Sequence, residues 1–128
     1  MAKNLDYNVE IVETSEDFSA RDRIRIKDFG NATQLDEACA DGSFILSPTG
    51  WAKLAVHNEK SSQDKDYSKY IILDVAGNKF ITGSESFWKS FIAIFEEMAE
   101  TGEEYQIEVY RRPSKNYKGK NFLSCSLV

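Results

Sequence analysis

The side chains best suited to binding chemistry in this sequence are cations and aromatic rings that occur close together. Their densest group runs from Arg111 to Lys120, where RRPSKNYKGK contains five basic residues, one tyrosine and no acidic residue. The whole chain has a formal net charge of −5, so this stretch is a local exception. Because local patches decide where a polyanion can approach, the stretch predicts a contact with nucleic acid.

Catalytic chemistry is poorly supported by the residues available. The chain has one histidine, His57, and two cysteines, Cys39 and Cys125, with no candidate base near either thiol in the sequence. No cluster with metal-ligand spacing, Gly-rich phosphate loop or nucleophile elbow is present. A histidine on a strand is more commonly a surface or structural residue than a catalyst. We therefore expect a protein that is not an enzyme and that uses no metal or cofactor.

Length and composition are typical of one globular domain. The chain has 128 residues, of which 41% are apolar and 29% charged. No apolar run approaches the roughly 20 residues that span a bilayer, and the N-terminus lacks the apolar core of a secretion signal. Two isolated cysteines suit a reducing compartment. These features predict a cytoplasmic protein with no membrane association.

Apolar periodicity predicts the elements that must position the cations and rings. Two-residue alternation indicates strands at 23–27, 44–57, 70–75, 79–82, 105–110 and 122–127. Phe87, Phe91, Ile94, Phe95 and Met98 fall on one face of a helix that begins near Ser84. Residues 1–20 form either an N-terminal arm or an extra strand, and residues 21–128 form the domain.

The order of these elements predicts a mainly β fold. A single helix follows the third strand and two strands follow the helix, which is the order of a five-stranded OB-fold-like barrel with one capping α-helix between strands 3 and 4. A five-stranded sheet with a packed helix in another topology is the alternative.

Alternation along these strands divides the side chains into an inner and an outer set. The outer set and the basic stretch together give the candidate nucleic-acid-binding residues: Arg23, Arg25, Lys27, Trp51, Lys53, Tyr70, Phe80, Tyr110, Arg111, Arg112, Lys115, Tyr117, Lys118, Lys120 and Phe122. Cations contact phosphates, and rings stack on bases with about 1–3 kcal/mol per base. The competing interpretation is that the rings pack in the core and that the cations keep a strand and a loop solvated.

The layout of the chain resembles small single-stranded-DNA-binding proteins of tailed phages that replicate by protein priming, and also those of conjugative plasmids. The resemblance covers roughly residues 20 to 128. Its elements are Arg23–Lys27, Asp41-Gly42, the polar loop Asn58–Ser68, the hairpin turn Val75–Phe80, the helix Ser84–Met98 and the closing hairpin Tyr105–Leu127.

This resemblance implies an OB-fold and sequence-independent binding of single-stranded DNA during replication or transfer of a phage or mobile element in a bacterial host cell. Replication or transfer proteins would then be partners, and oligomerisation would be possible. The alternative is a protein-interaction module, such as an inhibitor or assembly factor, that uses the same fold without nucleic acid.

Overall fold

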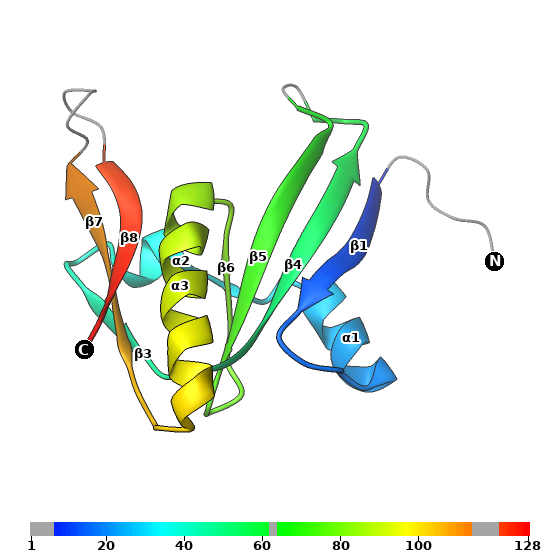
Figure 1. The fold of residues 1–128 in the computed structure, drawn as a ribbon. Helices are drawn as coiled ribbons and strands as arrows, with labels where there is room; N and C mark the ends of the chain where they lie inside the picture. Colours follow the sequence, from blue (N-terminus) through cyan, green and yellow to red (C-terminus); the bar gives the residue numbers. More distant parts are fainter. Residues whose placement is uncertain (1–6, 62–63, 114–120) are drawn as a thin grey trace.

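The computed structural model describes residues 7–61, 64–113 and 121–128. The fold is mainly β, with three helices among the described residues (Figure 1). The elements in chain order are β1 (Tyr7–Thr14), α1 (Ala20–Lys27), β2 (Thr33–Gln34), α2 (Leu35–Ala38), β3 (Phe44–Leu46), β4 (Pro48–Asn58), β5 (Asp66–Asp74), β6 (Lys79–Thr82), α3 (Glu85–Thr101), β7 (Ile107–Pro113) and β8 (Asn121–Leu127). None of these helices is long and apolar enough to cross a membrane.

The strands form two sheets that are joined by one continuous segment of chain. Sheet A has the order β1-β4-β5-β6-β2, and sheet B has the order β3-β7-β8. Only Ser47 separates β3 from β4, and the pairing of β4 with β5 is irregular between Pro48 and Gly50. Proline removes a ladder hydrogen bond, so the chain bends here and passes from one sheet to the other. Within the described ranges neither sheet closes into a barrel.

Helix α3 forms where the sequence predicts it. The Ser84 hydroxyl accepts a hydrogen bond from the Phe87 amide at 3.2 Å, and Gly102 ends the helix at φ 69°, a left-handed conformation that favours glycine. Phe87 and Phe91 are fully buried, whereas Phe95 is only partly buried. The helix therefore docks on the core through its N-terminal half.

The segment Arg23–Lys27 was expected to be a strand, and this prediction is wrong. It lies in α1, which begins after Ser19, whose hydroxyl accepts a hydrogen bond from the Asp22 amide at 3.2 Å. Alternation over five residues is too short to distinguish a strand from one and a half helical turns, and the N-cap favours the helix. Ile26 is buried, but Ile24 is 68% exposed.

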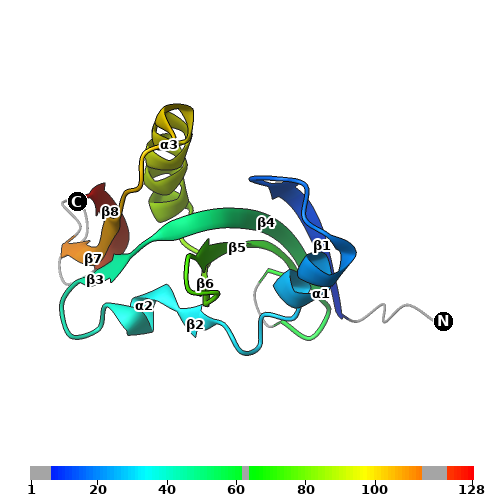
Figure 2. The ribbon, with the colours of Figure 1, turned by 90° about the horizontal axis from the view of Figure 1, so that it is seen from below.

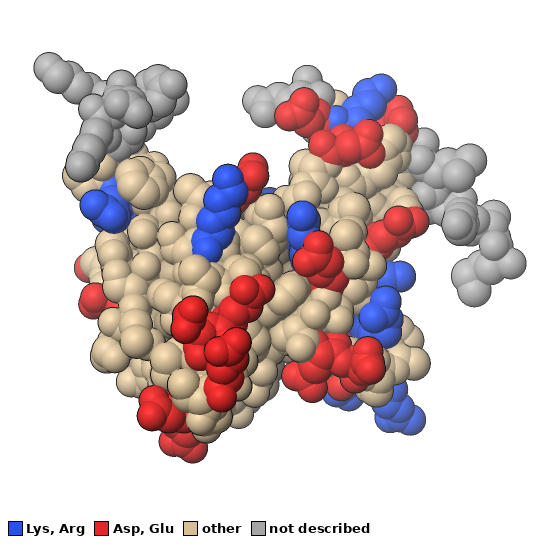
Figure 3. Space-filling model, in the orientation of Figure 1, with Lys and Arg blue, Asp and Glu red and all other residues tan. Residues whose placement is uncertain are grey.

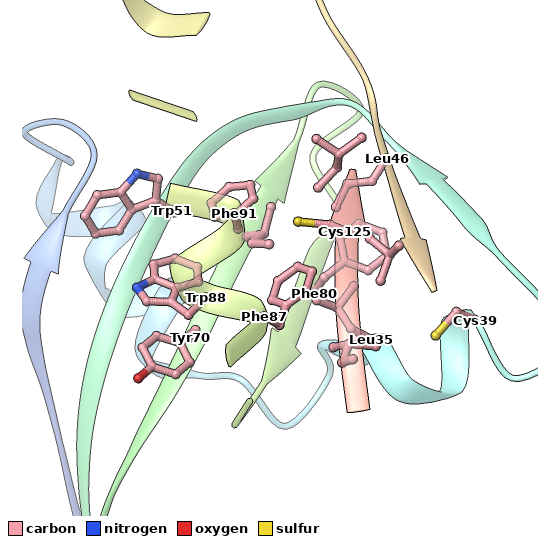
Figure 4. Close-up of a cluster of buried hydrophobic side chains, with 14 residues drawn as sticks. Leu35, Cys39, Leu46, Trp51, Tyr70, Phe80, Phe87, Trp88, Phe91 and Cys125 are labelled. Atoms are coloured by element: carbon pink, nitrogen blue, oxygen red, sulfur yellow. The ribbon is translucent and has the colours of Figure 1, made fainter. Parts of the chain in front are cut away.

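The central strands of sheet A are covered on both faces, because two separate apolar clusters lie there. One cluster, drawn in Figure 4, lies between sheet A, sheet B and α3, and includes Trp51, Tyr70 and Phe91. The other includes Leu54 and Ile71 and packs against α1 through Ile26. Figure 2 shows α3 and α1 on different sides of β4 and β5. Sheet A is therefore a middle layer of the domain.

Lys79 anchors the C-terminal end of α1 to β6. Its ammonium group donates hydrogen bonds to the carbonyl oxygens of Arg25 at 2.5 Å and Asp28 at 2.6 Å. A cation is favoured at this end of a helix, where carbonyl groups lack partners within the helix.

Replacing Lys79 by Ala should therefore lower the free energy of unfolding by about 1 kcal/mol, measured by urea denaturation. Lys27→Ala is the control, because it removes an exposed cation that belongs to α1 itself, and it should lower the free energy of unfolding less. Equal losses of stability in the two variants would contradict the anchoring role of Lys79.

Candidate nucleic-acid interface

The outer face of sheet B presents both an aromatic surface and a cation. Its residues are Ile45 on β3, Glu108, Tyr110 and Arg112 on β7, and Phe122, Ser124 and Ser126 on β8. Arg112 pairs with Phe122 across the two strands, and Tyr110 lies two positions before Arg112. Residues two apart on a strand point to the same side. The prediction that Tyr110, Arg112 and Phe122 share one face is confirmed.

Two contacts hold these side chains in place. The Arg112 guanidinium carbon lies 5.9 Å from the centre of the Phe122 ring, a distance typical of a cation–π interaction. The Tyr110 hydroxyl and the Ser126 hydroxyl are 2.6 Å apart and share a hydrogen bond. Phe122 remains 38% exposed. A partly exposed ring therefore carries a cation over it, and together they offer a base a stacking surface and a phosphate a charge.

Arg111 lies on the opposite face of β7 from Arg112. Its guanidinium group is 3.4 Å from a carboxylate oxygen of Asp36 and 3.4 Å from the Asp36 carbonyl oxygen. These contacts tie β7 to α2. The charge of Arg111 is also paired with that of Asp36. Arg111 therefore contributes less to a phosphate-binding surface than the sequence indicated.

The remaining residues of the basic stretch, Lys115, Tyr117, Lys118 and Lys120, lie outside the described residues. The strands before and after them are described: Pro113 pairs with Asn121 at the end of the β7–β8 hairpin. Residues 114–120 therefore connect directly to the end of the sheet at which Arg112 and Phe122 lie. In the view of Figure 1 this end of β7–β8 and the loop end of β4–β5 lie at the same edge of the molecule.

Trp51, Tyr70 and Phe80 were expected on the outer surface, and these three predictions are wrong. Their exposed fractions are 9%, 5% and 5%. Trp88 contacts two of them: its ring centre is 5.3 Å from that of Trp51 in an edge-on arrangement and 4.6 Å from that of Tyr70 in a stack (Figure 4). Alternation separates two faces of a strand but does not identify the solvated one, and here α1 covers the other face. These rings are not available for stacking on bases.

The predicted cations of the first half of the chain lie elsewhere. Arg23, Arg25 and Lys27 are exposed on α1, on the opposite side of the molecule from β7 and β8 in both ribbon views. Arg25 is 3.7 Å from an Asp22 carboxylate oxygen. Lys53 is half-buried on β4 and pairs with Tyr70 in the ladder. The structure therefore does not bring these cations together with Arg112 in one surface.

Acidic side chains mark a surface that is unfavourable for a polyanion. In Figure 3 they gather over the lower part of α3, whose last turns contain Glu96, Glu97 and Glu100. All three are exposed, and none forms a salt bridge with another described residue. Like charges repel a nucleic-acid backbone, so the charge distribution favours approach from sheet B and its hairpin.

No family model, curated protein or solved structure matches the chain. Within the described ranges, no group of three or more His, Cys, Asp or Glu side chains is placed to hold a metal ion.

Proposed function

We propose that this protein binds single-stranded DNA without sequence preference, using the outer face of sheet B and the basic segment at the end of the β7–β8 hairpin. The observation that carries the proposal is the pairing of Arg112 with the exposed ring of Phe122, next to a segment with further cations and no acid. Every base has a face on which an aromatic side chain can stack, and every nucleotide carries a phosphate. Aromatic and basic side chains can therefore contact a single strand of any sequence.

We further propose that the domain is an open variant of the OB-fold. The bent segment β3–β4 would be its first strand, followed by β5, β6, α3, β7 and β8, and the pairings of β4 with β5, β5 with β6, β3 with β7 and β7 with β8 support this assignment. β6 pairs with β2 instead of β8, and α3 packs against β8. In OB-folds the loops after the first and fourth strands flank the nucleic-acid groove; here these are the β4–β5 and β7–β8 loops.

The protein would act by occupying DNA and not by catalysis. A layer of bound protein protects a displaced strand from nucleases and from re-pairing while replication or transfer of a phage or mobile element proceeds. We base this setting on the resemblance to single-stranded-DNA-binding proteins of phages and conjugative plasmids. The same resemblance places the protein in the cytoplasm of a bacterial host, with replication or transfer proteins as partners.

Salt dependence tests the proposal directly. If four or five cations each neutralise one phosphate, log K for an oligo-dT should fall with log salt at a slope of about −3, because each single-strand contact contributes about −0.7. Replacing Arg112, Lys115, Lys118 and Lys120 by Ser should weaken binding and flatten this slope. Fluorescence anisotropy between about 50 and 300 mM salt measures both quantities.

The control removes the same charge from another surface. Replacing Arg21, Arg23, Arg25 and Lys27 on α1 by Ser changes the net charge equally, and this variant should keep most of the parent's slope. Equal flattening by both variants would indicate a general charge effect and would contradict the proposed site. Absence of binding by the parent at about 50 mM salt would refute the function. A protein-interaction module would then be favoured, since Ile45 and Phe122 are 44% and 38% exposed on the same face.

A further inference from the structure

His57 bonds carboxylates at both of its ring nitrogens. Nδ1 lies 2.7 Å from a carboxylate oxygen of Asp66, and Nε2 lies 2.8 Å from a carboxylate oxygen of Glu59. The second oxygen of Glu59 accepts a hydrogen bond from the Lys65 ammonium at 3.0 Å. The imidazole thus bridges the start of β5 and the turn that follows β4.

The chemistry of these groups defines the proton count. An ionised carboxylate only accepts hydrogen bonds, and a neutral imidazole has a single N–H group. Two short contacts to two carboxylates therefore require the doubly protonated ring. Removal of one ring proton must remove one of the two hydrogen bonds, so the bonding at this hairpin end depends on the protonation state of the ring.

The neighbouring charges favour the protonated form. β1 contributes Glu10, which lines a shallow depression of about 440 Å³ together with His57, Asp66 and the uncharged Asn8. The bond to Asp66, and then the bond to Glu59, raise the pKa of His57 above its ordinary value. The bond from Lys65, followed by that from His57, lowers the pKa of Glu59.

The other charged groups of the hairpin do not bond the ring. Lys60 and Asp64 are exposed in the loop, and neither forms a side-chain contact with His57. Lys53 lies four residues before His57 on β4, so the two side chains are on the same face of the strand. The ring therefore responds mainly to Asp66 and Glu59.

The backbone decides which bond is lost. Asp66 pairs with His57 in the β4–β5 ladder, so it stays opposite the ring. Glu59 lies beyond the ladder in the turn and has Lys65 as a second partner. We propose that His57 is a proton-operated latch on the β4–β5 hairpin: the protonated ring holds Glu59 and Asp66 together, and the neutral ring keeps Asp66 through Nδ1–H and releases Glu59.

The sign of the pH dependence follows from the two pKa directions. Because the pKa of His57 is raised by folding, its contribution to stability is fully present below about 6.5 and is lost as the pH rises through the folded value. Because the pKa of Glu59 is lowered, its contribution is present above about 4.3 and is lost as the pH falls through the folded value. The latch is therefore complete between roughly pH 4.5 and 6.5 and opens as the pH rises further.

Nuclear magnetic resonance of the full chain tests this latch, because His57 is the only histidine and its ¹⁵N signals need no assignment. The expected titration midpoint is above about 6.5, and the neutral ring should carry its proton on Nδ1. Glu59→Gln and Asp66→Asn should each lower the midpoint, whereas Asp64→Asn should leave it unchanged. Protection of the Asn58, Lys60 and Ser61 amides, corrected for intrinsic exchange, should fall several-fold in the parent as the ring deprotonates.

Three results would overturn the latch, and the parent alone can give two of them. These are a midpoint at or below about 6.5 and a neutral ring protonated on Nε2. The third is a pH-dependent fall in amide protection that is as large in Glu59→Gln as in the parent. The variant lacks the carboxylate whose bond to His57 is released, so the latch predicts a smaller fall. None of these measurements involves DNA, so the latch and the proposed binding function fail independently.

Discussion

Replacing Phe91 by Ala is expected to lower the free energy of unfolding by about 3–5 kcal/mol, because the whole ring is lost from a closed part of the core. Phe91 is 0% exposed. Its ring centre lies 5.1 Å from that of Trp88, 6.1 Å from that of Phe87 and 5.8 Å from that of Phe95. Urea unfolding followed by tryptophan fluorescence measures the loss, since Trp88 lies beside the new cavity.

Phe95→Ala is the matched control because it makes the same substitution one turn later in α3. Phe95 is only partly buried, so this variant should lose less than about 2 kcal/mol. The change in helix propensity is the same at both sites, and the difference between the variants therefore reports burial. A loss below about 1 kcal/mol at Phe91 would show that α3 is not docked on this core.

The largest expected effects on DNA affinity come from the two rings of the sheet B outer face. Phe122→Ala and Tyr110→Ala should each weaken binding of an oligo-dT by roughly 5- to 150-fold, which corresponds to about 1–3 kcal/mol per stacked base. The salt slope should remain close to that of the parent, because neither change removes a cation. Anisotropy titrations at several salt concentrations give affinity and slope together.

Ile45→Ala provides the control on the same face. Ile45 is 44% exposed but has no aromatic ring, so its removal should change affinity little. If Ile45→Ala weakened binding as strongly as Phe122→Ala, apolar contact and not stacking would be the source of affinity. If both ring variants bound DNA like the parent, the outer face of sheet B would not be the binding surface.

Local signals in the sequence were sufficient for α3 and for the two hairpins. The cap at Ser84, the 3.6-residue spacing of Phe87 and Phe91 and the turn between β5 and β6 all act over a few residues, and the structure contains each of them. The placement of Tyr110, Arg112 and Phe122 on one face of sheet B was also correct, because it needs only the two-residue period of the strands and their pairing.

A missed local cap explains one error, and tertiary packing explains the others. The strand expected at 23–27 is a helix, and the Ser19–Asp22 cap was the signal that could have revealed it. Trp51 and Tyr70 were predicted to lie on the outer surface, because the alternation along their strands was interpreted as one buried and one solvent-exposed face. Sheet A is buried on both faces, because α3 covers the face with Trp51 and Tyr70, and α1 covers the other.

The direct passage of the chain from β3 in sheet B to β4 in sheet A has a consequence for the order of assembly during folding. β4 meets β5 across a short loop, whereas the pairing of Phe44 with Val109 closes a loop that contains β4, β5, β6 and α3. Closing a longer loop costs more chain entropy before any contact compensates it. Sheet B should therefore be completed late, and substitutions at the β3–β7 contact should accelerate unfolding more than they slow folding.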